Sequence, residues 1–209
     1  MTFSMANIRP QFSFCRIEQY SSQRFHQVMR IYLAEFPRDS RLSIDRIRTL
    51  LKEGNYQLIV VEKNGQVLGF ALIWICRLPA FVHLDYLAVA REWRGKGVGT
   101  ALYRWLIAQL PDFSPRARLL TLEVENDLIS FYQRSQTRLL HNLLYQFPGP
   151  LGPVPMHLMV YDTQERTELD QRTVRGVMRA LYGGLHRRKS TDPLLRSCLA
   201  QVPAKVSLT

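Results

Sequence analysis

The sequence predicts one mixed α/β (α+β) domain, with a mostly antiparallel central sheet flanked by helices and a basic helical extension behind it. Nearly half of the 209 residues are hydrophobic, which is enough for a single sizeable core. Strand-like and helix-like patterns alternate irregularly, as in mixed folds. The composition changes near Asp162, so we expect the domain over residues 1–162 and a basic extension with one helix over 163–209.

The first half of the chain predicts two helices between strands. Ser21 or Ser22 can cap a helix that runs to about Phe36, and a second helix follows Ser43 and ends at Gly54. Two β-rich runs then flank the turn Asn64-Gly65, a strong hairpin signal. With residues 12–18 and 81–89, these runs give the strands of this half.

In the second half, an apolar face at helical spacing predicts a helix from Val98 to Leu110. A strand over residues 117–125 and a short helix near Asn126 follow. We expect two last strands over 138–147 and 155–162, separated by a turn-rich stretch. Beyond them, residues 169–188 read as one basic helix, and residues 189–209 show little periodicity.

The formal net charge is +11, which favours anionic partners such as nucleic acid, a phosphate-rich cofactor or an anionic membrane surface. A nucleic-acid-binding module is therefore one hypothesis, although no helix-turn-helix, zinc-finger or RNA-binding signature accompanies the charge. Its best support is a set of arginines in the extension. These are Arg172, Arg175, Arg179, Arg187 and Arg188.

The cysteines Cys15, Cys76 and Cys198 form no CxxC pair and no metal-like cluster with the five histidines. We therefore expect free thiols in a reducing compartment and no metal site. The N-terminus lacks the pattern of a signal peptide, and the longest apolar run is too short for the roughly 20 residues of a spanning helix. A cytoplasmic protein is expected, and a homodimer is one state that the sequence permits.

A glycine-studded turn, "RGKGVGT", joins the strand over residues 81–89 to the next helix. It fits neither the P-loop nor the dinucleotide fingerprint, whose glycine spacings differ. Glycines allow a close backbone approach, and the first amides of a helix lack internal partners, so such a turn can hold an anion. Arg94 and Lys96 add positive charge to it.

The pattern Arg94-x-x-Gly97-x-Gly99 resembles the acetyl-coenzyme-A motif of the GNAT superfamily of N-acetyltransferases. The segment "LEVENDLISFYQRS" is similar to the superfamily's next segment, except that Ser135-Gln136 stand where Gly and Phe or Ala usually follow. The resemblance covers about residues 12–162. It implies that the turn holds the pyrophosphate of acetyl-coenzyme A, and that the preceding strand pairs with the pantetheine arm. The implied cofactor-binding residues are Leu87, Ala88, Val89, Arg94, Gly95, Lys96, Gly97, Val98, Gly99, Thr100 and Asn126.

The implied reaction is direct transfer of an acetyl group to an amine on a small molecule or peptide. An alkylammonium must first lose a proton, and Asp85 is the leading candidate base. Glu123 and Glu125 are rivals, His83 is a weaker candidate, and each can instead be a polar surface group. Tyr132 matches the superfamily's proton donor to the leaving thiolate, or else packs beside Phe131.

The acceptor is poorly defined by the sequence. In the superfamily the first two helices and a late loop shape its side of the site. There Arg38 and Arg41 can contact an acidic acceptor or be solvated, and Tyr145 and Phe147 can line a pocket or pack. An acyl-coenzyme-A sensor, or a transferase for another acyl group, remains an alternative with the same fold.

Overall fold

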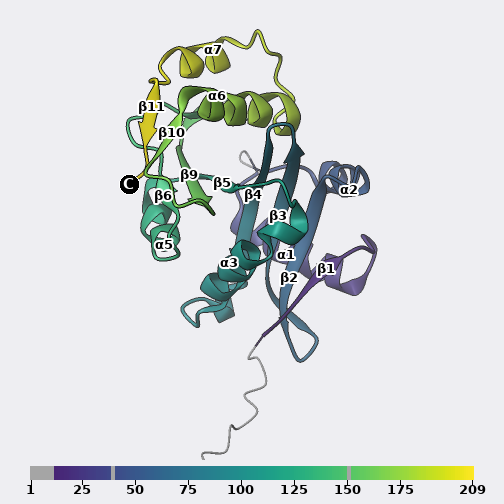
Figure 1. Ribbon diagram of the computed structural model, residues 1–209. Helices are drawn as coiled ribbons and strands as arrows, with labels where there is room; N and C mark the ends of the chain where they lie inside the picture. Colours follow the sequence, from purple (N-terminus) through teal and green to yellow (C-terminus); the bar gives the residue numbers. More distant parts are fainter. Residues whose placement is uncertain (1–11, 39–40, 150–151) are drawn as a thin grey trace, which may run out of the picture.

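A seven-stranded sheet forms the centre of the computed structural model, which describes residues 12–38, 41–149 and 152–209 (Figure 1). The strand order is β1-β2-β3-β4-β5-β9-β6, and every neighbouring pair is antiparallel except β4 and β5. This confirms the predicted mixed, mostly antiparallel sheet. The strands are β1 Ser13–Ile17, β2 Tyr56–Lys63, β3 Gln66–Arg77, β4 Ala80–Val89, β5 Leu119–Val124, β6 Arg138–Leu139 and β9 His157–Asp162.

Helices cover both faces of the sheet, and each face has its own apolar core. One core joins the sheet to the first two helices and the C-terminal extension, and the other joins it to the three middle helices. The helices are α1 Gln23–Glu35, α2 Ile44–Lys52, α3 Val98–Ala108, α4 Leu110–Phe113, α5 Ile129–Gln133, α6 Gln171–Ala180 and α7 Pro193–Ala200. No helix among the described residues is both long and apolar enough to cross a membrane.

Local sequence signals correctly predicted the starts of α1 and α2 and the turn between β2 and β3. The hydroxyl groups of Ser22 and Ser43 each accept a hydrogen bond of 3.2 Å from a backbone amide in the first turn of the helix they cap. Asn64 and Gly65 both have positive φ angles, of 51° and 77°, as a tight hairpin turn requires. The predicted hairpin and both predicted helices are therefore present.

The strand predicted over residues 138–147 is wrong in its extent. Only β6 pairs with the main sheet, and the chain then turns away to β7 (Gln146–Gly149). The stretch predicted as a simple turn instead continues into β8 (Gly152–Pro155), which pairs with β7 as a separate hairpin. Pro148, Pro153 and Pro155 lack the amide hydrogen that a central strand must donate, which keeps this hairpin outside the main sheet.

The extension contains more structure than the one helix predicted for it. The helix expected over residues 169–188 is α6, which ends at Ala180 and passes into a π-helical turn, Leu181–Leu185. A second helix, α7, lies in the stretch that showed little periodicity, and β10 (Glu168–Asp170) pairs with β11 (Lys205–Ser207). The division of the chain at residue 162 stays a prediction.

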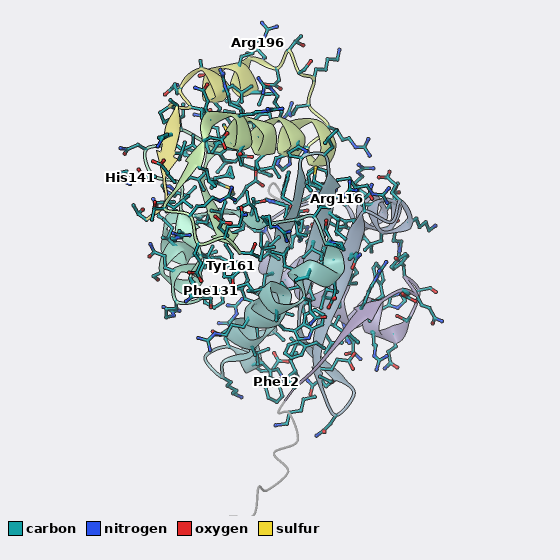
Figure 2. The ribbon with its side chains drawn as sticks, in the orientation of Figure 1. Phe12, Arg116, Phe131, His141, Tyr161 and Arg196 are labelled. Atoms are coloured by element: carbon teal, nitrogen blue, oxygen red, sulfur yellow. The ribbon has the colours of Figure 1, made fainter. Side chains whose placement is uncertain are left out.

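The extension packs onto the domain at the β3–β4 hairpin. In Figure 1, α6 and α7 lie together at the end of the molecule reached by β3 and β4. A Cβ atom at Gly184 would lie 2.6 Å from the Trp74 ring on β3, so the backbone of the extension touches that ring. Arg196 of α7 lies at the opposite end of the molecule from Phe12 (Figure 2). The π-helical turn thereby lies against β3 near Trp74.

Candidate active site

The sheet splits between β4 and β5, and the split creates the site. The two parallel strands pair only from Val82 with Leu120 to Leu84 with Leu122. Asp85 and Glu123 are the next residues on the two strands. In addition, β4 carries a bulge at Asp85, since Leu72 pairs with Tyr86 and Ile73 with Leu84. The two carboxylates therefore lie where the strands separate.

A cavity of about 780 Å³ opens beside the last residues of β4 and the glycine turn. Gly97 caps α3 with a φ of 77°, and Gly95 has a φ of 71°, a region that favours glycine. A Cβ atom at Gly99 would lie 3.4 Å from a Val89 methyl group, an ordinary van der Waals distance, so α3 lies next to β4 at this position. The predicted residues in the cavity wall are Leu87, Ala88, Val89, Arg94, Gly95, Gly97, Val98, Gly99, Thr100 and Tyr132.

Two predicted cofactor residues lie elsewhere among the described residues. The Lys96 ammonium lies 4.8 Å from the centre of the Trp93 ring, outside the cavity wall. The amide oxygen of Asn126 contacts the Nε2 atom of His157 at 2.5 Å, and Asp127 and Leu128 line the cavity instead. Both predictions remain untested, since a bound cofactor can contact residues that lie just beyond an empty cavity.

Arg94 lies at the mouth of the cavity. Its guanidinium forms an ion pair with Glu35 of α1, and its Nε atom donates to the carbonyl oxygen of Val89 at 3.4 Å. The ion pair joins the glycine turn to α1 across the opening, because both residues line it. This places one cation next to the free amides of the turn.

Tyr132 lies in the wall of this cavity, on α5. Its ring packs edge-on against Tyr103, with ring centres 4.9 Å apart. Burial raises the pKa of Tyr132, so the hydroxyl keeps its proton at neutral pH. Among the described residues no hydrogen bond to this hydroxyl is present, so its proton is free for a ligand. The helix that carries it ends at Gln133, and Gln136 in the turn that follows has a positive φ of 61°.

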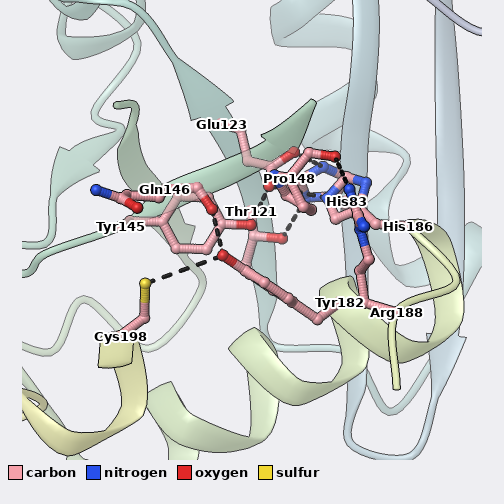
Figure 3. Close-up of polar contacts among 10 residues, drawn as sticks. All are labelled: His83, Thr121, Glu123, Tyr145, Gln146, Pro148, Tyr182, His186, Arg188 and Cys198. Atoms are coloured by element: carbon pink, nitrogen blue, oxygen red, sulfur yellow. Dashed lines mark hydrogen bonds and ion pairs between the residues drawn. The ribbon is translucent and has the colours of Figure 1, made fainter. Parts of the chain in front are cut away.

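Glu123 is the centre of a buried polar cluster (Figure 3). Its carboxylate accepts hydrogen bonds from the Tyr145 hydroxyl and from the His186 Nε2 atom at 3.1 Å. The Nε2 atom of His83 lies 3.6 Å from its second oxygen. Burial alone would raise the pKa of Glu123, but His186 and His83 outweigh burial and hold it well below its usual range. Glu123 is therefore held as a carboxylate.

Asp85 has a different environment from Glu123. The Tyr56 hydroxyl donates a hydrogen bond to its carboxylate. Burial raises the pKa of Asp85 above its usual value, although His83 and the Tyr56 hydroxyl oppose that shift. The two carboxylates at the split are thus pushed in opposite directions, one toward holding a proton and one toward remaining charged. Glu125, the other rival base, is exposed.

His186 is the residue that sequence analysis missed. It follows the π-helical turn and lies 63 residues from Glu123 in the chain, yet their side chains are only 9% and 6% exposed and in contact. Burial alone would lower the pKa of His186, but Glu123 raises it above 6.5. Glu123 therefore favours the charged form of this buried side chain, and no local pattern around His186 indicates this role.

A metal ion was not predicted, yet three potential ligands lie together at the split. His83, Asp85 and Glu123 each offer one atom within 4.8 Å of the others. Glu123 and Asp85 already accept hydrogen bonds from tyrosine hydroxyls, which compete with a metal for those oxygens. The second nitrogen of His83 contacts the Thr121 hydroxyl at 2.9 Å and so orients the ring.

A sheet split beside a parallel strand pair, with a glycine turn at the head of the next helix, matches the fold of the GNAT acetyltransferases. The chain belongs to the acetyltransferase (GNAT) family, whose model matches residues 25–136. Members of this family use acetyl-coenzyme A. The family prediction made from Arg94, Gly97 and Gly99 is thereby confirmed.

Known relatives agree with the family. An uncharacterised protein of Dictyostelium discoideum is 30% identical over 111 residues, which cover 53% of this chain and 25% of that protein. A structure from Bacteroides thetaiotaomicron, assigned to the GNAT acetyltransferases, has a TM-score of 0.72 at 22% identity, covering 85% of this chain and 99% of its own. Arabidopsis thaliana NAA60 in complex with acetyl-coenzyme A has a TM-score of 0.57 at 18% identity, covering 73% and 99%. At these identities the structures establish the shared fold.

Proposed function

We propose that this protein is an N-acetyltransferase, which transfers the acetyl group of acetyl-coenzyme A to a primary amine by direct attack. The observation that carries the proposal is the cavity of about 780 Å³, which joins the glycine turn, the free edge of β4 and the Tyr132 hydroxyl. It offers an anion site at one end and a proton donor at the other. A cytoplasmic location stays a prediction from the sequence.

The cofactor is held by backbone groups in this proposal. The amides of residues 95–100 bind the pyrophosphate at the N-terminus of α3. The edge of β4 from Leu87 to Val89 has unpaired groups beyond the split, and these suit the amides of the pantetheine arm. A backbone amide near Val89 polarises the thioester carbonyl in the transition state.

Asp85 is the base that the environment favours. The amine arrives as an ammonium and gives one proton to the Asp85 carboxylate, directly or through water, before its nitrogen attacks the thioester carbon. The raised pKa of Asp85 makes it the better proton acceptor of the two buried carboxylates. Glu123, held charged by His186, fits the role of an organising anion for this part of the site.

Tyr132 completes the reaction by protonating the leaving group. As the tetrahedral intermediate collapses, the bond between carbon and sulfur breaks and the thiolate takes the proton of the Tyr132 hydroxyl. The attacking nitrogen gives up its second proton as the amide forms, and this proton restores the Tyr132 hydroxyl. The products are a neutral amide and free coenzyme A, and Asp85 releases the first proton to water. The hydroxyl without a partner in the cavity wall supports this assignment.

Gly97→Glu tests the cofactor site. The new side chain would enter the cradle for the pyrophosphate and bring a negative charge, so we expect coenzyme-A binding to be lost in a calorimetric titration. Gly54→Glu is the matched control, because Gly54 also has a positive φ, of 83°, and open space around it, but lies outside the cavity. Unchanged coenzyme-A affinity in Gly97→Glu would refute the proposed site.

Tyr132→Phe tests the proton donor. A positioned general acid contributes about 10²-fold or more, so turnover should fall by that order while coenzyme-A affinity stays the same. Tyr161→Phe is the control, because Tyr161 packs in the same core without lining the cavity. Thiol release measured with pooled amines reports the rate, and an unaltered rate removes Tyr132 from this role. A protein that binds acetyl-coenzyme A and acetylates no amine would instead be a sensor.

A further inference from the structure

A second cavity, of about 360 Å³, has Asp85 in its wall. A third cavity, of about 320 Å³, lies at the split and has both Asp85 and Glu123 in its wall. The third cavity shares Phe36 and Leu128 with the cofactor cavity, and Asp85 and Phe147 with the second one. The third cavity therefore borders both of the others, and Asp85 lines it together with the second one.

Four arginines line the second cavity and come from distant parts of the chain. Arg41 lies in the segment before α2 and Arg46 lies in α2, whereas Arg187 and Arg188 directly follow His186 in the extension. Arg41 donates to the carbonyl oxygens of Leu33 and Phe36 at 2.9 and 2.8 Å. Arg188 donates to those of Pro148 and Gly149 at 3.2 and 3.4 Å.

Positive charge in this cavity exceeds negative charge among the described residues. Within the described part of the chain, the hydrogen bonds of Arg41 and Arg188 go to backbone carbonyls, which hold the guanidinium groups without neutralising them. Arg46 and Arg187 share one carboxylate, Glu53, at 3.8 and 3.3 Å. The Nη2 atom of Arg46 is buried with no hydrogen-bond partner in the described part of the chain. A buried donor without a partner favours a ligand that accepts hydrogen bonds.

We propose that this cavity binds the acceptor, and that the acceptor is a small primary amine carrying a carboxylate or phosphate group. The proposal rests on the proposed acetyltransferase function. Asp85 attracts the ammonium end toward the thioester, and the arginines hold the anionic end in the opposite direction. Guanidinium groups bind both anions through forked hydrogen bonds, so the two anions share one recognition chemistry.

The dimensions of the cavity agree with a small acceptor. A volume of about 360 Å³ lies at the lower end of the usual range for small-molecule sites. Phe147 and Leu42 give it an apolar wall, which suits a short carbon chain between the two charged ends. The opposed charges at its two ends fix one orientation, with the amine nearest the acetyl group.

Matched pairs of acceptors test the proposal by turnover. Alanine is compared with alaninamide, and O-phosphoethanolamine with ethanolamine, by thiol release from acetyl-coenzyme A. A charged hydrogen bond contributes about 10-fold or more, so the anionic member of at least one pair should have a kcat/KM at least about 10-fold higher. The pair that shows the preference distinguishes a carboxylate from a phosphate. Equal or better turnover of the neutral members overturns the proposal.

Arginine variants locate the preference. Arg46→Gln and Arg188→Gln should each reduce the ratio of kcat/KM between the anionic and neutral members by about 10-fold. Arg179→Gln is the matched control, since Arg179 is exposed on α6 and lines neither cavity. If the ratio of kcat/KM falls equally in the control, or falls in none of the variants, the preference comes from the overall positive charge of the protein. Either result overturns the assignment of the anion site to this cavity.

A binding measurement separates this proposal from the proposed function. O-phosphoethanolamine, ethanolamine and alanine are titrated calorimetrically into protein saturated with coenzyme A, so that the glycine turn is already occupied. Binding of an anionic probe that Arg46→Gln and Arg188→Gln weaken about 10-fold supports the anion site even if no acetyl transfer occurs. Absent or variant-independent binding overturns the site, even if the protein acetylates other amines.

Discussion

Replacing His186 by glutamine should destabilise the protein in a manner that depends on pH. The His186 Nε2 atom lies 3.1 Å from the Glu123 carboxylate, and both side chains are buried. The pKa of His186 is raised above 6.5, so its charge stabilises the fold fully below about pH 6.5, and this contribution is lost as the pH rises through the raised pKa. The pKa of Glu123 is lowered, so its contribution is present above about pH 4.5 and lost in acid.

The expected magnitude follows from what remains after the substitution. Breaking a buried ion pair costs about 3–5 kcal/mol. The lower end applies, because the Tyr145 hydroxyl and His83 still face Glu123. At pH 5.5 we therefore expect a loss of about 3 kcal/mol, or about 6–12 °C in Tm for a chain of this size. Well above the pKa of His186 only a neutral hydrogen bond is lost, so the cost falls to about 1 kcal/mol.

Urea unfolding of wild type and His186→Gln across pH 5 to 9 measures this difference. Asp85 and Arg188 also act on the charge of His186, in opposite directions, so the measured difference includes both of these interactions. His157→Gln is the control, because His157 contacts a neutral group, the amide oxygen of Asn126, and its effect on stability should be small. A loss of stability in His186→Gln that is the same at every pH would refute the buried ion pair.

Two further substitutions test the packing of the extension and the junction before it. Gly184→Ala should lower the free energy of unfolding by about 1–3 kcal/mol, because its Cβ would overlap the Trp74 ring. Gly183→Ala is the control and should be neutral or stabilising, because no atom lies nearer than 4.0 Å to its Cβ. Thermal unfolding compares the two variants, and equal effects would contradict the close contact. Asp162→Asn should cost about 1.5–3 kcal/mol near neutral pH, because Arg166 donates to this buried carboxylate at 2.7 and 3.1 Å. Burial alone would raise the pKa of Asp162, but the hydrogen bonds from Arg166 hold it low. The free energies of unfolding of wild type and Asp162→Asn, measured by denaturation, should therefore converge as the pH falls. A difference that stays constant with pH would argue against a charged Asp162.

The parts of the fold that the sequence predicted are those with local physical causes. Ser22 and Ser43 satisfy the amides of the turn that follows them, and Asn64-Gly65 adopt backbone angles that few other residues tolerate. The helix α7 had such a signal as well, since Asp192 caps it and Pro193 opens it. Its eight residues were too few for periodicity to show it.

The candidate site divides in the same way. The glycine turn could be recognised because every group that shapes it lies within seven consecutive residues. The bulge at Asp85 has no glycine or proline to mark it, and it arises from the pairing of β4 with β3. His186 reaches Glu123 only because the extension packs against Trp74, a contact between segments far apart in the chain. Such contacts depend on the tertiary fold, so the sequence did not define the side of the site that receives the acceptor.

If the arm of acetyl-coenzyme A follows the free edge of β4, as proposed above, the point at which β4 and β5 stop pairing limits the length of the acyl group. Five residues of β4, from Asp85 to Val89, lie between the last paired residue and the end of the strand. At about 3.3 Å per residue they span about 16 Å. A pantetheine arm that starts at the glycine turn and follows this edge reaches, at its acyl end, the part of the sheet where β4 and β5 are paired. The ladder that holds the sheet together would thus limit how long an acyl chain the protein accepts.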